Sequence, residues 1–295
     1  MEEKPNDSIT KLKGRIDAII KDRPSHKEVL EFIREVMTEQ CKIKPKVKTD
    51  SVKIDKENIK PTMEGFPLVE KRDLPLDMAS ATRLFKRLCK VLSRGKGASR
   101  DSKRIYQALC SKEINLVELF KQAGAENGDY VSTLSKKLGV REDLLYFLAA
   151  NSVKPILEAY ANELKGYVDQ ERWWKGYCPI CGSPPFIAEL REEGERFLVC
   201  SSCSYEWRFR RLKCPFCENE DHQGLKYFYA EREGKANRVD VCGKCKRYIK
   251  AIDIRELPSD FISSAEDAGT LYLDVLAQEE GYEREGRMYG GFGFW

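Results

Sequence analysis

Eight of the eleven cysteines in this chain form four pairs that each enclose two residues. Two residues between a pair of cysteines let both sulfurs face one point, and two such turns supply four thiolates in tetrahedral geometry. Zn²⁺ and iron both accept this ligand set. The candidate metal ligands are Cys178, Cys181, Cys200, Cys203, Cys214, Cys217, Cys242 and Cys245.

The cysteine pairs repeat along the chain. A Cys-Pro-x-Cys pair opens each unit, at 178–181 and at 214–217, and a second pair closes it, at 200–203 and at 242–245. Gaps of 18 residues (182–199) and 24 residues (218–241) suit a hairpin between opening and closing pairs. We therefore expect two tandem modules with one ion each. A crossed arrangement, in which the first and third pairs share an ion, is the less favoured alternative.

A redox role for these pairs is the main alternative chemistry. It requires an exposed thiol of low pKa near a helix N-terminus, and no long helical pattern follows any pair. A structural ion instead contributes roughly 10–16 kcal/mol of apparent binding energy, which a small module with few apolar side chains needs. Among the other cysteines, Cys41, Cys89 and Cys110, we expect Cys89 to be buried and unreactive, and we do not assign His222 as a ligand.

Residues 1–168 predict an all-helical domain. The Ser25-x-x-Glu28 pattern indicates a capping box ahead of apolar residues at helical spacing. Asp77 is the expected N-cap of a helix over 77–93, and further helical pattern covers 101–124, 129–138 and 141–165. Pro155 should kink the last segment or start a new helix there. A lysine- and proline-rich stretch over 41–75 predicts a long, extended and mobile connection.

After Trp173 and Trp174 the residue pattern changes from helical to β-type. Short β-type runs occur at 186–187, 197–199, 205–209, 227–229 and 248–252. The predicted fold class is therefore α+β, with a helical domain (1–168), two rubredoxin-like or zinc-ribbon-like modules (169–212 and 213–257) and a C-terminal helix and tail (258–295). We expect that helix over 264–280, and a loosely ordered end over Phe292–Trp295. Trp173, Trp174 and Trp207 either pack around the modules or form a partner-binding surface, and packing is favoured.

Composition narrows the class of protein. No apolar run approaches the roughly 20 residues that cross a bilayer, and the polar N-terminus does not resemble a signal peptide, so a cytoplasmic location is expected. The net charge of +4 is small for 295 residues. A basic cluster interleaved with aromatic residues is the one nucleic-acid-like feature, but acidic residues share these modules and a mixed solvated face is favoured. The basic residues are Arg208, Arg210, Arg211, Lys213, Lys244, Lys246, Arg247 and Lys250.

The chain resembles the formate dehydrogenase accessory protein (FdhE) family. The resemblance is carried by Cys178–Pro185, by Cys200–Cys203 with Glu206, Trp207 and Arg211, by Lys213–Cys217, by Cys242–Cys245 with Tyr248–Lys250, and by Leu273, Asp274 and 278–282. It is specific over 173–282 and weaker towards the N-terminus, and the connection at 41–75 matches nothing in the family.

The resemblance implies a cytoplasmic factor that is needed to form active formate dehydrogenase and that binds the catalytic subunit of that enzyme. It also implies iron at the cysteine sites, with zinc as the alternative. No catalytic set or phosphate-binding loop is recognisable, so we expect neither catalysis nor a small-molecule substrate. A zinc-ribbon nucleic-acid-binding protein and a rubredoxin-like electron carrier are the two other functions to weigh.

Overall fold

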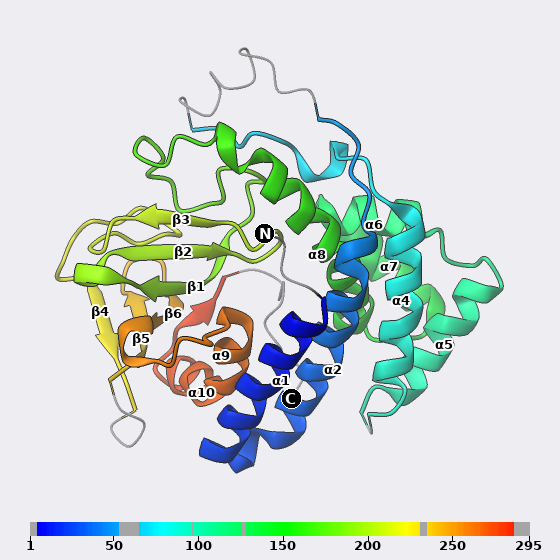
Figure 1. Cartoon of the computed structure of the whole chain (residues 1–295), viewed down its shortest axis with the longest axis horizontal. Helices are drawn as coiled ribbons and strands as arrows, with labels where there is room; N and C mark the ends of the chain where they lie inside the picture. Colours follow the sequence, from blue (N-terminus) through cyan, green and yellow to red (C-terminus); the bar gives the residue numbers. More distant parts are fainter. Residues whose placement is uncertain (1–4, 53–64, 96, 126–127, 231–234, 286–295) are drawn as a thin grey trace.

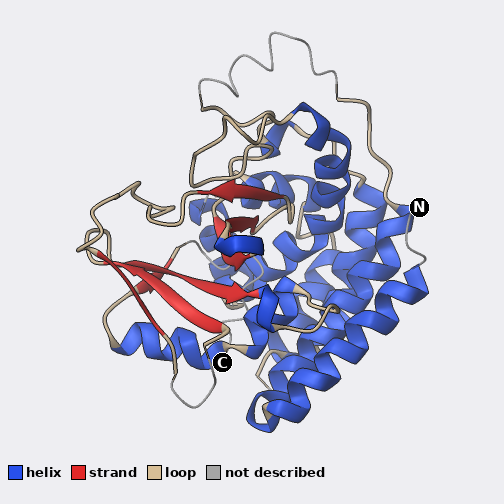
Figure 2. Ribbon diagram, turned by 60° about the vertical axis from the view of Figure 1, so that its left-hand side comes forward, coloured by secondary structure: helices blue, strands red, loops and turns tan. Residues whose placement is uncertain are grey.

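The N-terminal half of the chain folds into helices, and the C-terminal half forms one sheet beside them (Figure 1). The computed structural model describes residues 5–52, 65–95, 97–125, 128–230 and 235–285. Figure 2 shows the same division into a helical layer and a twisted sheet. The α+β class predicted from the sequence is confirmed.

Helix α8 is the centre of the helical part. It runs over Glu142–Leu164, and its residues are buried on almost every side because apolar side chains surround the whole helix. Amphipathic helices pack around it and turn their charged faces outwards. These helices are α2 (Lys27–Ile43), α4 (Met78–Leu92), α5 (Ser99–Cys110), α6 (Leu116–Gly124) and α7 (Gly128–Leu138). Helix α1 (Pro5–Asp22) packs against α2 instead.

Of the two predicted helix N-termini, the structure confirms one and contradicts the other. Asp77 caps α4 by accepting a hydrogen bond from Ser80 N at 3.0 Å, as expected. The Ser25 capping box is wrong, because Pro24 begins a short 3-10 turn and α2 starts only at Lys27. The helical pattern predicted over 101–124 corresponds to two helices, α5 and α6. Lys112 adopts a positive φ of 62° after α5, and Asn115 then caps α6.

Pro155 lies inside α8 without ending it, so a new helix does not start there. Proline has no N–H, so the carbonyl of Asn151 loses its partner within the helix. The buried side chain of Gln40 replaces that donor, since its Nε2 lies 3.1 Å from both Asn151 O and Asn151 Oδ1. A side chain from α2 thus completes the backbone hydrogen bonding of α8.

The described strands form one seven-stranded sheet in the order β3-β2-β1-β6-β5-β4, with β7 beside β6. Each cysteine unit supplies an antiparallel set of three strands, and the first strand of one set pairs in parallel with the last strand of the other. The strands are β1 (Pro185–Leu190), β2 (Arg196–Cys200), β3 (Glu206–Phe209), β4 (Leu225–Phe228), β5 (Asn237–Cys242), β6 (Arg247–Asp253) and β7 (Glu283–Arg284).

Five of these strands lie where β-type runs were expected, whereas β5 and the two-residue β7 were missed. The parallel pairing of β1 with β6, for example Ile187 opposite Lys250, was not predicted either. It joins the two cysteine units into one sheet. The residue ranges assigned to the separate modules remain a prediction.

The C-terminal helices connect the sheet to the N-terminal helices. The single helix expected over 264–280 is two helices, α9 (Ser263–Gly269) and α10 (Leu271–Glu279), parted at Thr270, where φ is −115° and ψ is 32°. Helix α9 packs against α1 and α2, while α10 packs against β5 and β6. Contact with α1 is close, because a Cβ on Gly269 would lie 2.7 Å from Ile19 Cγ2. The tail over Phe292–Trp295 lies outside the described residues.

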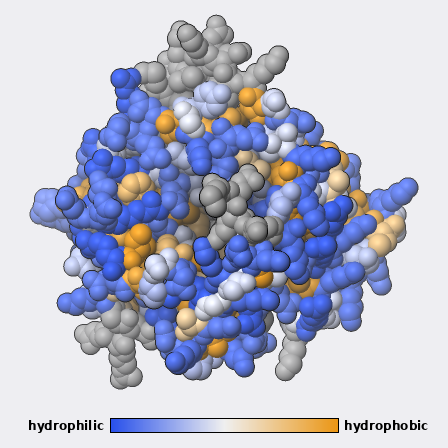
Figure 3. Space-filling model, in the orientation of Figure 1, coloured by the Kyte–Doolittle hydropathy of each residue, from blue (hydrophilic) through white to orange (hydrophobic). Residues whose placement is uncertain are grey.

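The surface on the side seen in Figure 1 is mostly polar. The face in Figure 3 is largely hydrophilic, and its apolar residues form small separate patches. Within the part of the chain that the structure describes, no helix is long and apolar enough to span a bilayer.

Candidate metal centres

The first cysteine cluster gathers the sulfurs of Cys178, Cys181, Cys200 and Cys203. All four side chains are buried. Their Sγ atoms lie 3.6 Å apart between Cys178 and Cys203, 3.5 Å between Cys181 and Cys200, and 3.6 Å between Cys181 and Cys203. The opening and closing pairs of one unit therefore face a single point.

The second cluster repeats this arrangement with Cys214, Cys217, Cys242 and Cys245. The sulfurs of Cys214 and Cys245 are 3.7 Å apart, and those of Cys217 and Cys242 are 3.6 Å apart. Cys217 and Cys245 are only half-buried, so this cluster is nearer to solvent than the first. In both units the sulfurs group as the sequential pairing predicts, and the crossed arrangement is wrong.

These distances fit a tetrahedral ion. Metal–sulfur bonds of about 2.3 Å place neighbouring thiolates of a regular tetrahedron about 3.8 Å apart. A disulfide would instead bring two sulfurs to about 2.05 Å. The eight cysteines have free thiols in the structure. Each cluster could therefore hold one ion, and the geometry suits zinc and iron equally.

All four Cys-x-x-Cys turns share one backbone conformation. The residue after each second cysteine has a positive φ, with values of 72° at Gly182, 55° at Ser204, 57° at Glu218 and 59° at Lys246. Its N–H donates to the carbonyl of the first cysteine at 2.9–3.2 Å. Only the first turn uses glycine, so the others hold an ordinary residue in a conformation that costs about 1–2 kcal/mol.

Burial and local hydrogen bonds set the charge state of the thiols. In the first cluster, the N–H groups of Ser202 and Cys203 both donate to Cys200 Sγ at 3.4 Å. Burial raises the pKa of Cys178, whereas hydrogen bonds from the neighbouring thiols lower the pKa of Cys181. In the second cluster, burial raises the pKa of Cys214. Four buried thiolates therefore need a cation to share one site.

The 41–75 connection contributes directly to the first cluster. Leu68 N and Val69 N donate to the carbonyls of Pro179 and Ile180 at 2.8 and 3.0 Å, inside the opening turn. Tyr177 Oη donates to the carbonyl of Gly65. The described end of this segment is therefore packed against a cysteine turn, contrary to the expectation of a mobile connection. Residues 53–64 lie outside the described part of the chain.

Helix α8 covers the closing turn of the same cluster. Lys154 Nζ donates to Ser201 O at 3.1 Å, and Ser204 Oγ donates to Glu158 Oε1 at 2.8 Å. Burial alone would raise the pKa of Glu158, but Lys44 and Lys154 together lower it below its usual value. The helical part and the first cysteine cluster thus share a contact that involves charged side chains.

The cysteines and histidine outside the clusters lie apart from them. Cys89 is buried at 1% exposure, and burial raises its pKa to about 12, so the expectation of an unreactive thiol is supported. Cys110 is exposed, Cys41 is half-buried and His222 is exposed. None of these joins a metal-like group among the described residues.

The tryptophans serve mainly as packing. Trp207 and Trp173 are buried, and their indole N–H groups donate to Lys175 O at 3.0 Å and to Tyr177 O at 2.9 Å. Trp174 is half-buried and lies under the guanidinium groups of Arg208 and Arg210. The favoured packing interpretation therefore applies to the two buried indoles.

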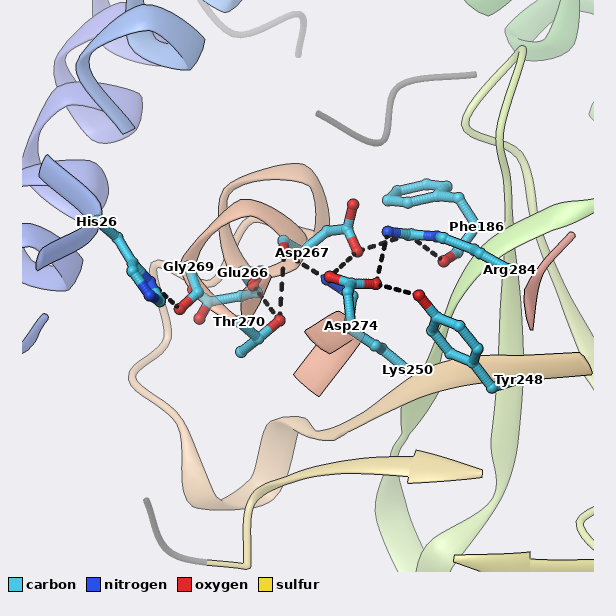
Figure 4. A network of polar contacts seen from close by, with 10 residues as sticks. All are labelled: His26, Phe186, Tyr248, Lys250, Glu266, Asp267, Gly269, Thr270, Asp274 and Arg284. Atoms are coloured by element: carbon cyan, nitrogen blue, oxygen red, sulfur yellow. Dashed lines mark hydrogen bonds and ion pairs between the residues drawn. The ribbon is translucent and has the colours of Figure 1, made fainter. Parts of the chain in front are cut away.

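A second group of buried polar side chains attaches α9 and α10 to the sheet (Figure 4). The fully buried Lys250 donates from Nζ to Asp274 Oδ2 at 2.6 Å and to Asp267 O at 2.6 Å, and also pairs with Asp267 Oδ1 at 2.7 Å. Arg284 bridges the same two carboxylates, and Tyr248 Oη donates to Asp274 Oδ1. Because two cations balance two carboxylates, this group is self-contained and structural.

Two family models match the C-terminal half of the chain. The model described as the FdhE central domain covers residues 177–211, and the FdhE C-terminal domain covers residues 212–289. The boundary between the two models falls between the two cysteine clusters.

Similar proteins extend the likeness to the whole chain. A protein FdhE homolog from Aquifex aeolicus is 29% identical over 95% of this chain and 94% of its own length. Another, from Stutzerimonas stutzeri, is 36% identical over 39% of this chain and 38% of its own length. The crystal structure of the FdhE protein from Pseudomonas aeruginosa has a TM-score of 0.66, with 21% identity, over 97% of this chain and 95% of that one. At this identity the crystal structure shows a shared fold.

Proposed function

Because the chain belongs to the FdhE family, we propose that it is a non-enzymatic factor needed to form active formate dehydrogenase. In this proposal it acts in the cytoplasm and binds the catalytic subunit of that enzyme. The observation that carries the proposal is the pair of four-cysteine clusters, located in the two segments that match the family models.

The eight cysteines are proposed as ligands of two ions, with iron implied by the family resemblance and zinc as the alternative. An ion at each cluster would fix two turns and the strands that follow them. Residues of the chain then extend this rigidity outwards, since the first cluster is held between the 65–70 segment and α8. We infer that the resulting rigid surface is what the catalytic subunit contacts.

Capture of the formate dehydrogenase catalytic subunit from the same organism tests this proposal. Wild type should retain the subunit, while a double variant with Cys178→Ser and Cys214→Ser should lose it because each change removes one ligand of a cluster. Cys110→Ser is the matched control, since this exposed thiol lies outside both clusters. The control should capture as much subunit as wild type does.

Two results would contradict the proposal. Equal capture by the double variant, with its helical content retained, would reject a binding face built by the metal sites. Failure of wild type to capture the subunit, or to restore formate dehydrogenase activity in cells that lack the factor, would reject the accessory role itself.

The nucleic-acid alternative receives little support from the charge distribution. Arg208 pairs with Glu195 at 2.7 Å, Arg210 with Glu220 at 3.3 Å, and Lys250 is fully buried with two carboxylates. The basic cluster seen in the sequence is therefore largely an ion-paired surface rather than a free positive face. Metal analysis with an absorption spectrum of anaerobically purified protein would separate iron from zinc, and a zinc-only protein from iron-replete cells would dispose of the electron-carrier alternative.

A further inference from the structure

A cavity of about 190 Å³ lies beside the second cysteine cluster. Strands β4 and β5 form one wall, at the end of the sheet farthest from the N-terminal helices (Figure 1), and the segment over 211–216 forms another. Leu212 and Tyr227 line this cavity, and their exposed fractions are 68% and 60%. An opening that is lined by exposed apolar side chains can accept the apolar part of a ligand.

The cavity is lined by six cationic side chains and one carboxylate, Asp240. The cations are Arg196, Arg211, Lys213, Lys226, Arg238 and Arg247. Four of them have a carboxylate within 4.0 Å: Lys213 pairs with Glu218, Arg247 with Glu285, and both Arg238 and Arg196 with Asp240. Within the described residues, no carboxylate lies within 4.0 Å of Arg211 or Lys226.

Arg196 is the unusual member, because it is only 3% exposed and lacks partners for part of its guanidinium. Its Nη1 donates to Lys213 O at 3.1 Å. Its Nη2 lies 3.5 Å from Asp240 Oδ2, yet neither Nη2 nor Nε makes a hydrogen bond to any residue that the structure describes. Burial lowers the pKa of this arginine, although the nearby carboxylate of Asp240 acts in the opposite direction. Buried donors without acceptors are rare and call for an explanation.

Water molecules or the nearby thiolates could also compensate the buried guanidinium of Arg196, but each would do so only in part. Water could accept from Nε and Nη2, but water does not neutralise the charge. The thiolates of Cys214 and Cys242 also border the cavity and offset part of the positive field. Even so, no described sulfur accepts a hydrogen bond from Arg196. An anion that enters the cavity would satisfy both the unpaired donors and the unpaired cations.

We propose that this cavity binds a small organic anion. Its carboxylate or phosphate would accept from Arg196 and lie near Arg211 and Lys226, while its apolar part would pack on Leu212 and Tyr227. Arginine suits this role because its planar fork matches a carboxylate or a phosphate. The anion is a ligand rather than a substrate, and the inference goes beyond the proposed accessory function and does not depend on it.

Isothermal titration of the metal-loaded protein with four probes tests the proposal. Phenyl phosphate and benzoate carry both an anion and an apolar ring, inorganic phosphate carries only the anion, and benzyl alcohol carries only the ring. The two aromatic anions should bind with millimolar or tighter affinity, and more tightly than inorganic phosphate. Whichever of the two aromatic anions binds more tightly identifies the preferred head group, phosphate or carboxylate. Benzyl alcohol should not bind.

Matched variants locate the site. Arg211→Gln removes an exposed cation of the cavity and should weaken the better aromatic anion by about tenfold or more. Arg208→Gln removes the same charge from a neighbouring strand that does not line the cavity, and should leave the affinity unchanged. Arg196→Gln should weaken binding further, provided that metal content and circular dichroism match wild type. Absence of binding by every anion at millimolar concentration, equal weakening by Arg208→Gln and Arg211→Gln, or equal binding of benzyl alcohol would each overturn the proposal.

Discussion

Removal of the buried Lys250 side chain should destabilise the protein strongly. Lys250 Nζ contacts both Asp267 and Asp274, and the side chain has no exposed surface. In Lys250→Met, two buried carboxylates would face one remaining cation, Arg284. Breaking a buried ion pair in this way costs about 3–5 kcal/mol, because an uncompensated charge stays buried. At an m value of about 3 kcal/mol/M, the midpoint of urea unfolding should fall by about 1 M or more.

A double variant that restores the balance of buried charges tests the same ion-pair group. Asp274→Asn removes one carboxylate, so the double variant with Lys250→Met again has one cation and one carboxylate. The double variant should therefore lose about 1–2 kcal/mol less than the sum of the two single changes. Lys103→Met, on the exposed face of α5, is the control and should change stability by no more than about 0.5 kcal/mol.

Acid should reduce the difference between wild type and Lys250→Met. Burial raises the pKa of Asp267, but Arg284 and Lys250 together lower it below its usual value. Such a group stabilises the folded state above its unfolded pKa of about 3.9, and this contribution is lost as the pH falls through the lower folded value. In the variant, protonation of the carboxylates removes the uncompensated charge. Strict additivity of the single changes in urea unfolding, or a gap that persists in acid, would refute the reasoning.

Three further substitutions test local geometry by urea unfolding. Gly176→Ala should cost more than about 3 kcal/mol, because the added Cβ would lie 1.7 Å from a carbonyl oxygen of the third cysteine turn. Gly14→Ala, in open space on α1, should stabilise by about 0.5–1 kcal/mol, and equal effects of these two changes would contradict the close contact. Gly182→Ala should cost about 1–2 kcal/mol because φ is 72° there, and a neutral result would argue against this turn conformation. Gln40→Leu should cost about 1–3 kcal/mol by leaving a carbonyl of α8 without a donor, and no loss would mean that water replaces it.

The cysteine clusters were the most predictable feature because their geometry is local. Two residues between cysteines determine one turn, and a hairpin of any ordinary length brings the second turn opposite the first. The structure groups the eight sulfurs as this argument expects. The positive φ at Ser204, Glu218 and Lys246 was not predictable from residue type, because these residues do not favour that conformation. Only the position after a second cysteine marks it.

The sheet was less predictable because its central pairing is not local. Strand β1 lies in the first cysteine unit and pairs with β6 at the end of the second unit, so the two strands are far apart in the sequence. Nothing in the residues of either strand specifies the other as its partner. Strand β5 was missed although Arg238 and Asp240 alternate with Val239 and Val241, which is the period-2 pattern of a half-buried strand, so this strand was predictable. The connection over 41–75 was assigned no contact, although Leu68 and Val69 bind the first cysteine turn through backbone atoms, which carry no sequence signal.

The burial and the partners of charged residues were the least predictable features of the fold. Lys250 was grouped with a solvated basic cluster because lysines cover its neighbourhood in the sequence, yet it is fully buried between carboxylates supplied by Asp267 and Asp274. Nothing in the sequence distinguishes Arg196, although two of its buried nitrogens make no hydrogen bond within the described residues. The cost of burying a charge depends on which opposite charges the fold brings to it. Two cations that look alike in the sequence therefore acquire different roles: Lys250 has its partners within the chain, while Arg196 has donors to offer to a ligand.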